Sequence, residues 1–214
     1  MTAPQLLLVL DARSGDAALE RVRAALDAVP IASAVIRSHQ PGSGQPAADA
    51  ATVKPLVALL QARGVAALIH SDIALARTTG ADGVHLVLAA GGPDPATVVK
   101  TARSAVGPGQ IVGVEIASGL RHDAMVAGES GADYIAFSGP NHDALIAWWA
   151  ELFELPCVAL GSSSMGVADP HAATNLGQAG ADFIAVALNG AQTPADIQTA
   201  MRELAAALVR RDQA

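Results

Sequence analysis

One short motif occurs three times along the chain and constrains the fold more than any other feature. Gly-Ala-Asp begins at Gly80, Gly131 and Gly180, so the copies are 51 and 49 residues apart. Each copy follows a helical pattern and precedes an apolar run, as expected where a helix ends on a left-handed glycine and the chain enters a strand. Further apolar runs lie between the copies, so one strand and one helix together take about 25 residues. This period predicts a repeated strand–helix architecture.

Extending the period along the chain predicts strands that alternate with helices. The strands are expected at 6–10, 31–36, 65–70, 83–87, 111–114, 134–137, 157–160 and 183–187. The helices are expected near 16–28, 50–62, 72–79, 94–106, 118–130, 142–153, 168–179 and 194–210. Most strand segments are continuously apolar, as strands covered on both faces must be. Asp94, Asp169 and Thr193 each precede a proline and are typical residues for capping a helix start.

Eight strands alternating with eight helices predict an α/β protein with a single (β/α)8 TIM barrel. The 214 residues show no break in composition, so we expect one domain over residues 1–214. A doubly wound sheet is the alternative, but it would use fewer strands. It would also show a glycine-rich fingerprint after the first strand, and no G-x-G-x-x-G follows Leu10.

Composition excludes several classes of protein. The chain is 51% hydrophobic and 15% charged, so it can bury a core and is not a disordered chain. Its net charge of −7 leaves no strongly basic face for nucleic acid. A single cysteine, Cys157, excludes a disulfide framework and is expected to be an inert core residue. The sequence contains neither a signal peptide pattern nor a membrane-spanning apolar run, so we expect a cytoplasmic protein.

The barrel prediction places the residues that follow each strand at one mouth, where barrel sites are built. These are Asp11, Arg13, Arg37, His39, His70, Asp72, Glu115, Ser138, Asn141, His142, Gly161-Ser162-Ser163-Ser164 and Asn189-Gly190. We expect a phosphate site from Gly161, Ser162, Ser163, Asn189 and Gly190, because loops after the last two barrel strands often bind phosphate through backbone N–H groups. The alternative for each of these residues is a structural role as a strand-end or capping residue.

Individual side chains at this mouth suggest further roles. Arg37 is expected to contact an anion because its guanidinium fork suits phosphate, with His39 lining the same pocket. Asp72 is the candidate general base, with His70 beside it and Glu115 as a further catalytic candidate. His39, His70 and Asp72 could meet as a metal site, but their spacing is not specific to one, and we predict no metal site.

Two other features allow more than one interpretation. His85 lies within the fourth strand and is expected to point into the barrel or toward a hydrogen-bonded neighbour, which favours a structural role. Trp148 and Trp149 are adjacent in the sixth helix and cannot both face the barrel. One of them could therefore contact another protein, and a homodimer is one such assembly.

Several segments resemble the thiamine-phosphate synthase family, which includes the TenI-like barrels. They are Ile69–Leu86 with its Gly-Ala-Asp-Gly-Val-His-Leu, then Val106–Val114, and the later copies of Gly-Ala-Asp. The similarity runs from about residue 5 to 208 with every strand in register. The family enzyme joins a pyrimidine pyrophosphate to a thiazole phosphate with Mg²⁺, so the resemblance implies a transferase of thiamine biosynthesis that binds a phosphorylated small molecule.

The chain departs from the family pattern at the mouth. The two Mg²⁺-binding carboxylates of the pattern correspond to Ser71 and Ala90, and the fourth-strand loop 87–90 is apolar. The lysine of the second-strand motif corresponds to His39, and the serine after the fifth strand to Glu115. The lysine of the loop after the sixth strand is also lost. The tautomerase branch uses a histidine at the position of Ala117.

These departures predict a divergent member with doubtful synthase activity. We expect it to bind a phosphorylated heterocycle of the thiazole phosphate or thiamine phosphate type at the mouth. Two alternatives remain. One is a non-catalytic binding or sensor protein, which the apolar 87–90 segment favours. The other is an enzyme with a different reaction on a phosphorylated small molecule, which the histidines and Asp72 favour.

Overall fold

The computed structural model describes residues 3–39, 46–161, 166–188 and 192–209. Within these residues, eight parallel strands pair in chain order and β1 closes on β8. The strands are β1 (Gln5–Asp11), β2 (Ser33–Arg37), β3 (Ala66–His70), β4 (Gly83–Leu88), β5 (Ile111–Ile116), β6 (Tyr134–Ser138), β7 (Cys157–Gly161) and β8 (Phe183–Leu188). This closed ring confirms the predicted (β/α)8 barrel and excludes the doubly wound sheet.

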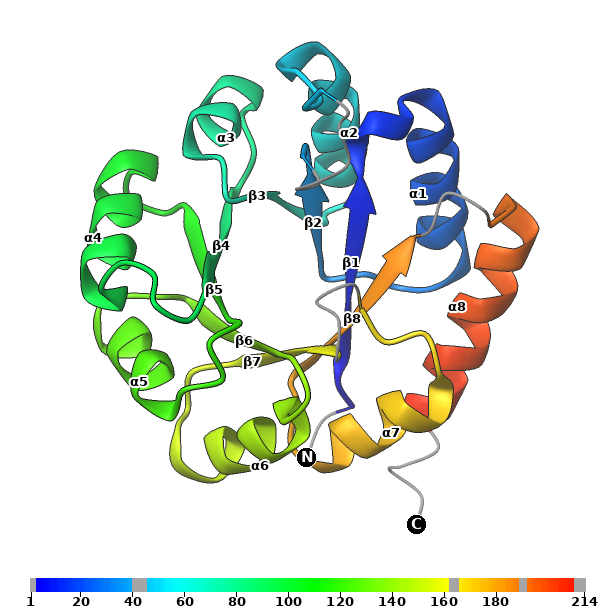
Figure 1. Ribbon diagram of the computed structural model, residues 1–214. Helices are drawn as coiled ribbons and strands as arrows, with labels where there is room; N and C mark the ends of the chain where they lie inside the picture. The colour runs from blue at the N-terminus through cyan, green and yellow to red at the C-terminus, as the bar shows by residue number, and fades with distance from the viewer. Residues whose placement is uncertain (1–2, 40–45, 162–165, 189–191, 210–214) are drawn as a thin grey trace.

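Helices surround the ring of strands (Figure 1). They are α1 (Asp16–Ala28), α2 (Ala50–Ala62), α3 (Ile73–Thr79), α4 (Pro95–Val106), α5 (Arg121–Glu129), α6 (His142–Leu152), α7 (Pro170–Gln178) and α8 (Pro194–Val209), with a short 3-10 turn η1 (Ala12–Ser14) after β1. Among the described residues, no helix is long and apolar enough to cross a membrane.

The strands bury apolar side chains on both of their faces. Side chains such as Leu8, Ile69 and Phe137 point outward into the large core shared with the helices. The intervening side chains point inward and form a second cluster, made of Leu7, Val9, Val35, Leu68, Tyr134, Ala136, Val158, Leu160 and Ala185. Because successive side chains alternate between these two cores, a barrel strand has an almost continuous apolar sequence.

The glycine of each Gly-Ala-Asp copy ends a helix in the conformation that the sequence predicts. Gly80, Gly131 and Gly180 have φ values of 71°, 101° and 105°. Side chains with a Cβ rarely adopt this left-handed region, whereas glycine adopts it without strain. The repeat therefore marks the point where each of these three helices turns toward its next strand.

The aspartate of each copy connects two neighbouring strands at the N-terminal end of the barrel. Asp82, just before β4, accepts a hydrogen bond from the backbone N–H of Ala67 in β3 at 2.7 Å. Its own backbone N–H donates to the Ala67 carbonyl at 2.8 Å. The same two bonds join Asp133 to Val112 at 2.7 and 2.8 Å, and Asp182 to Cys157 at 2.8 and 3.0 Å. The repeat therefore has a structural role at the end of the barrel opposite the mouth.

Helix starts also follow the predicted caps. Asp94 and Asp169 accept hydrogen bonds from backbone N–H groups three residues later, at 2.9 and 2.8 Å. Thr193 Oγ1 accepts the N–H of Asp196 at 3.2 Å. The predicted helix 118–130 begins later, at Arg121. The difference arises because Ser118 N–H bonds to the Leu88 carbonyl and the next residue, a glycine, has a φ of 70°, which forms a turn.

Candidate functional site

Strand alternation directs polar side chains into the barrel at its C-terminal mouth. Arg37 follows inward-facing Val35 by two residues, and His70 follows inward-facing Leu68 by two residues. Strand register then sets their neighbours, because Arg37 pairs with Asp11 and His70 pairs with His85. Three predicted site residues, Arg37, His70 and Glu115, are thereby brought to one end of the barrel.

The rim at β1 and β2 holds two arginines and a carboxylate. Asp11 Oδ1 accepts the backbone N–H of Arg13 at 2.9 Å and its Nε–H at 2.9 Å, and Arg13 Nη2 donates to Oδ2. Burial raises the pKa of Asp11, but Arg13 and the more remote Arg37 outweigh it and lower the pKa below its usual value. Burial also lowers the pKa of Arg37, while Glu115 and Asp11 raise it, so Arg37 lies within the field of both carboxylates. An arginine remains charged despite such a shift.

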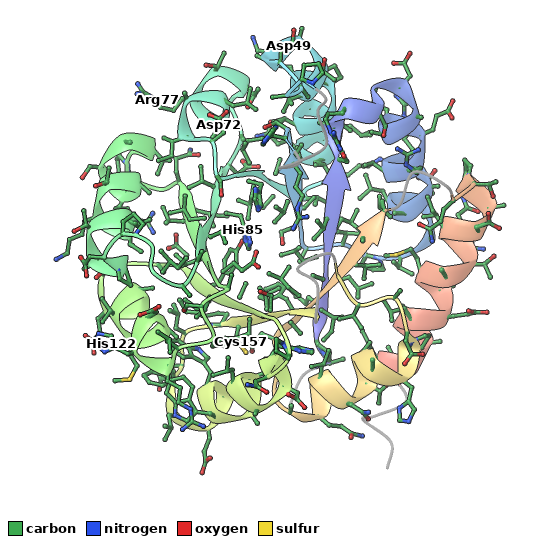
Figure 2. The ribbon with its side chains drawn as sticks, viewed as in Figure 1. Asp49, Asp72, Arg77, His85, His122 and Cys157 are labelled. Carbon is green, nitrogen blue, oxygen red and sulfur yellow. The ribbon has the colours of Figure 1, made fainter. Side chains whose placement is uncertain are left out.

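A chain of buried hydrogen bonds occupies the barrel interior beneath the rim. Burial raises the pKa of Tyr134, so its hydroxyl stays protonated. That hydroxyl contacts His85 Nδ1 at 2.7 Å, and His85 Nε2 lies 3.4 Å from Glu115 Oε2. Ser138 Oγ donates to Glu115 Oε1 at 2.7 Å. Both ring nitrogens of His85 therefore have a polar partner, the Tyr134 hydroxyl at Nδ1 and the Glu115 carboxyl group at Nε2. Figure 2 shows His85 inside the ring of strands.

A glycine on the adjacent strand makes room for this chain. A Cβ on Gly113 would lie 1.9 Å from Tyr134 Cζ, so only glycine allows the phenol ring to cross β5. Tyr134 was not among the predicted site residues. Its signal in the sequence is the inward alternation of Tyr134, Ala136 and Ser138 along β6, opposite a strand that contains glycine.

His70 lies on the mouth side of the interior chain. Its ring stacks on His85 with centroids 5.8 Å apart and planes 28° apart. Burial, followed by the charges of His85 and Arg37, lowers the pKa of His70 to about 4 despite the opposing effect of Glu115. His70 is therefore a neutral imidazole at pH 7, able to accept or donate a hydrogen bond at the mouth.

The structure gives Asp72 a structural contact. Its Oδ1 accepts the backbone N–H of Leu75 at 2.8 Å and caps α3, which it precedes (Figure 2). Its role as a general base stays a prediction. His39 is exposed beyond β2, and Gly161 ends β7 with a φ of 78°. The predicted phosphate residues Ser162, Ser163, Asn189 and Gly190 lie outside the described residues.

The Mg²⁺ that the family resemblance implies does not fit the residues present. Ser71 has a φ of 53° and its backbone N–H donates to the His85 carbonyl, while Ala90 is an exposed residue after β4. Neither side chain supplies a carboxylate. Among the described residues there is no group of three or more His, Cys, Asp or Glu side chains that could hold a metal ion.

Comparison with known proteins shows the family. The family model for thiamine monophosphate synthase (TMP-TENI) matches residues 6–189. A thiamine-phosphate synthase from Erythrobacter litoralis is 36% identical over 94% of this chain and 93% of its own length. One from Rhodospirillum centenum is 39% identical over 76% and 77%. A solved thiamine phosphate pyrophosphorylase from Pyrococcus furiosus shares the fold, with a TM-score of 0.72 and 22% identity over 96% of both chains. The chain therefore belongs to the thiamine monophosphate synthase family.

Proposed function

We propose that this chain binds a phosphorylated heterocycle, of the thiazole phosphate or thiamine phosphate type, at the C-terminal mouth of its barrel. Family membership supports a role in thiamine biosynthesis. The observation that carries the proposal is the partly buried guanidinium of Arg37, which faces the mouth between Asp11 and Glu115. A guanidinium held in a low-dielectric site binds phosphate oxygens more strongly than one in open water.

We further propose that synthase activity is weak. Catalysis of the family reaction needs groups that stabilise a diphosphate leaving group. The positions that would supply them carry Ser71, Ala90 and His39 instead of carboxylates and a lysine. Loss of one contact that stabilises developing negative charge costs about 2.7–4 kcal/mol of barrier, and several are replaced here.

Ligand binding can be tested by thermal-shift measurements. The probes are thiazole phosphate, thiamine phosphate and inorganic phosphate. We expect at least one of the two heterocycles to raise the melting temperature of the wild type and to have no effect on Arg37→Gln. Arg63→Gln is the matched control, because Arg63 forms an exposed ion pair with Asp27 at 2.9 Å. No shift with any of the three probes would contradict the proposed pocket.

Synthase activity needs a separate assay with Mg²⁺, the pyrimidine pyrophosphate and the thiazole phosphate. The Erythrobacter litoralis synthase is a suitable reference, because it aligns over nearly the whole chain. We expect turnover more than about tenfold below the reference, because one lost transition-state contact already corresponds to a factor of about 100 or more. Turnover within tenfold would show that the family reaction survives the substitutions.

A second candidate is an enzyme that moves a proton on the same kind of ligand. It is favoured by His70, whose neutral imidazole at the mouth is suited to accept a proton. Exchange of ligand hydrogens with D₂O, followed by NMR, tests this activity. Exchange by the wild type but not by His70→Asn would support it. If neither protein catalyses exchange, the non-catalytic binding protein favoured by the apolar 87–90 segment is the better account.

A further inference from the structure

The two inward-facing carboxylates at the mouth and four aspartates that cap helices at that end of the barrel already accept hydrogen bonds from the protein. Asp11 binds the backbone and side chain of Arg13, and Glu115 accepts from Ser138 and lies against His85. Asp72 caps α3. Asp49, Asp94 and Asp169 cap α2, α4 and α7 in the same way. A divalent cation that recruited any of these six carboxylates would therefore have to displace an existing donor.

The two mouth carboxylates that face inward are the least available. Glu115 is 1% exposed, and both of its oxygens have donors within the barrel. Asp11 is held by the planar fork of Arg13, a geometry that fixes both carboxylate oxygens. Mg²⁺ demands near-octahedral oxygen ligands and gives up its water reluctantly, so it does not compete well for carboxylates held in this way.

The sequences of the segments outside the described residues that follow β2, β7 and β8 contain no further carboxylate, histidine or cysteine. These segments are 40–45, 162–165 and 189–191. The positive charge at the mouth instead comes from Arg13 and Arg37, which offset Asp11 and Glu115. His70 adds no charge at pH 7. Two arginines balanced by two carboxylates leave no surplus positive charge, so without a metal this mouth disfavours a diphosphate more strongly than a single phosphate group.

We propose that the mouth holds no divalent cation and that a phosphate monoester binds there against the guanidinium of Arg37. The identity of the ligand in this inference rests on the proposed function. The statement that no metal binds at the mouth does not. This inference differs from what the family resemblance implies, because the positive charge facing the bound anion comes from Arg37 and not from a metal ion. Mg²⁺ then leaves the affinity for a phosphate monoester unchanged.

The metal is tested first, without any ligand. Mn²⁺ is used in place of Mg²⁺, and its binding to the full chain is followed by electron paramagnetic resonance. We expect no saturable binding in the millimolar range. The variant Ser71→Asp/Ala90→Asp restores both carboxylates of the family pattern and is expected to gain a saturable site. Saturable binding of Mn²⁺ at the wild-type mouth would overturn the proposal. If the double variant gains no site, the substitutions at Ser71 and Ala90 do not explain why the wild type lacks one.

The ligand is tested by calorimetric titration of thiamine phosphate with Mg²⁺ and, separately, with a chelator. We expect dissociation constants equal within about twofold. Arg37→Gln should weaken binding by about tenfold or more, as loss of a charge-assisted contact does. Arg63→Gln should leave binding unchanged. Tenfold tighter binding with Mg²⁺ would overturn the proposal. Absence of binding under both conditions would refute the proposed function, while the Mn²⁺ titration would still decide whether the mouth holds a metal.

Discussion

The repeated aspartates give the sharpest test of how this sequence closes its barrel. Replacing Asp82, Asp133 or Asp182 by alanine removes the acceptor of a strand N–H while leaving that N–H at the end of a buried strand. A hydrogen bond to a charged group contributes about 1.5–3 kcal/mol, and an orphaned buried N–H costs a similar amount. Asp82 is the least exposed of the three, so its loss should cost most. Asp82 and Asp133 each accept one further side-chain hydrogen bond, from Gln61 and Arg103 respectively. We expect the free energy of unfolding to fall by about 2–3 kcal/mol in Asp82→Ala and by about 1–2 kcal/mol in Asp133→Ala and Asp182→Ala.

Urea unfolding followed by circular dichroism measures these differences. For a chain of this size, 2 kcal/mol also lowers the melting temperature by about 4–8 °C. The control is Asp27→Ala, which breaks only an exposed ion pair and should cost less than about 1 kcal/mol. Asparagine at the same three positions keeps an acceptor oxygen and should recover part of the loss. If the three alanine variants unfold at the same urea concentration as Asp27→Ala, the aspartates do not hold the barrel together.

Three further predictions concern residues of the barrel strands. The pKa of His70 is about 4 in the folded state and about 6.5 when unfolded, so the unfolded chain takes up the proton first as the pH falls. The free energy of unfolding of the wild type, measured in urea, should therefore fall by up to about 2 kcal/mol between pH 7.5 and 5. The same change of pH should lower the free energy of unfolding of His70→Asn by correspondingly less. Gly113→Ala should lower the free energy of unfolding by about 3 kcal/mol in the wild type and by less in the Tyr134→Ala variant. Equal losses in the two proteins would contradict the contact between position 113 and the Tyr134 ring. Burial raises the pKa of Cys157 to about 12, so a thiol reagent at pH 8 should modify this cysteine only when the protein is unfolded in urea. Modification of the folded protein at the rate seen in urea would contradict the burial of Cys157.

The elements could be predicted from the sequence because their determinants are local. Strand segments were visible as apolar runs, since both faces of each barrel strand are buried. The helices Asp16–Ala28 and Ala50–Ala62 have the predicted bounds, and α4 and α7 begin at prolines that follow capping aspartates. The helix expected at 118 begins later because a bond from Ser118 to a neighbouring strand forms a turn. A contact with a distant segment of this kind leaves no local signal.

The site was less predictable because its contacts join distant residues. The sequence identified Arg37, His70 and Glu115 as candidates, and strand order brings them to one end of the barrel. It could not show that Glu115 and Tyr134 both reach His85, since those contacts span 30 and 49 positions of the chain. They depend on barrel closure, on strand register and on the missing side chain at Gly113.

Aspartate illustrates why residue type alone does not assign a role in this chain. At the N-terminal end of the barrel it joins neighbouring strands, and at the starts of helices it caps backbone N–H groups. Asp11 instead fixes an arginine at the mouth. The same reasoning applies to Glu115, whose carboxylate is the acceptor for Ser138 and faces His85. Returning to the serine of the family pattern at this position would leave both groups without that acceptor and would remove one of the two carboxylates that act on Arg37. A change at Glu115 would therefore alter the interior chain and the rim together.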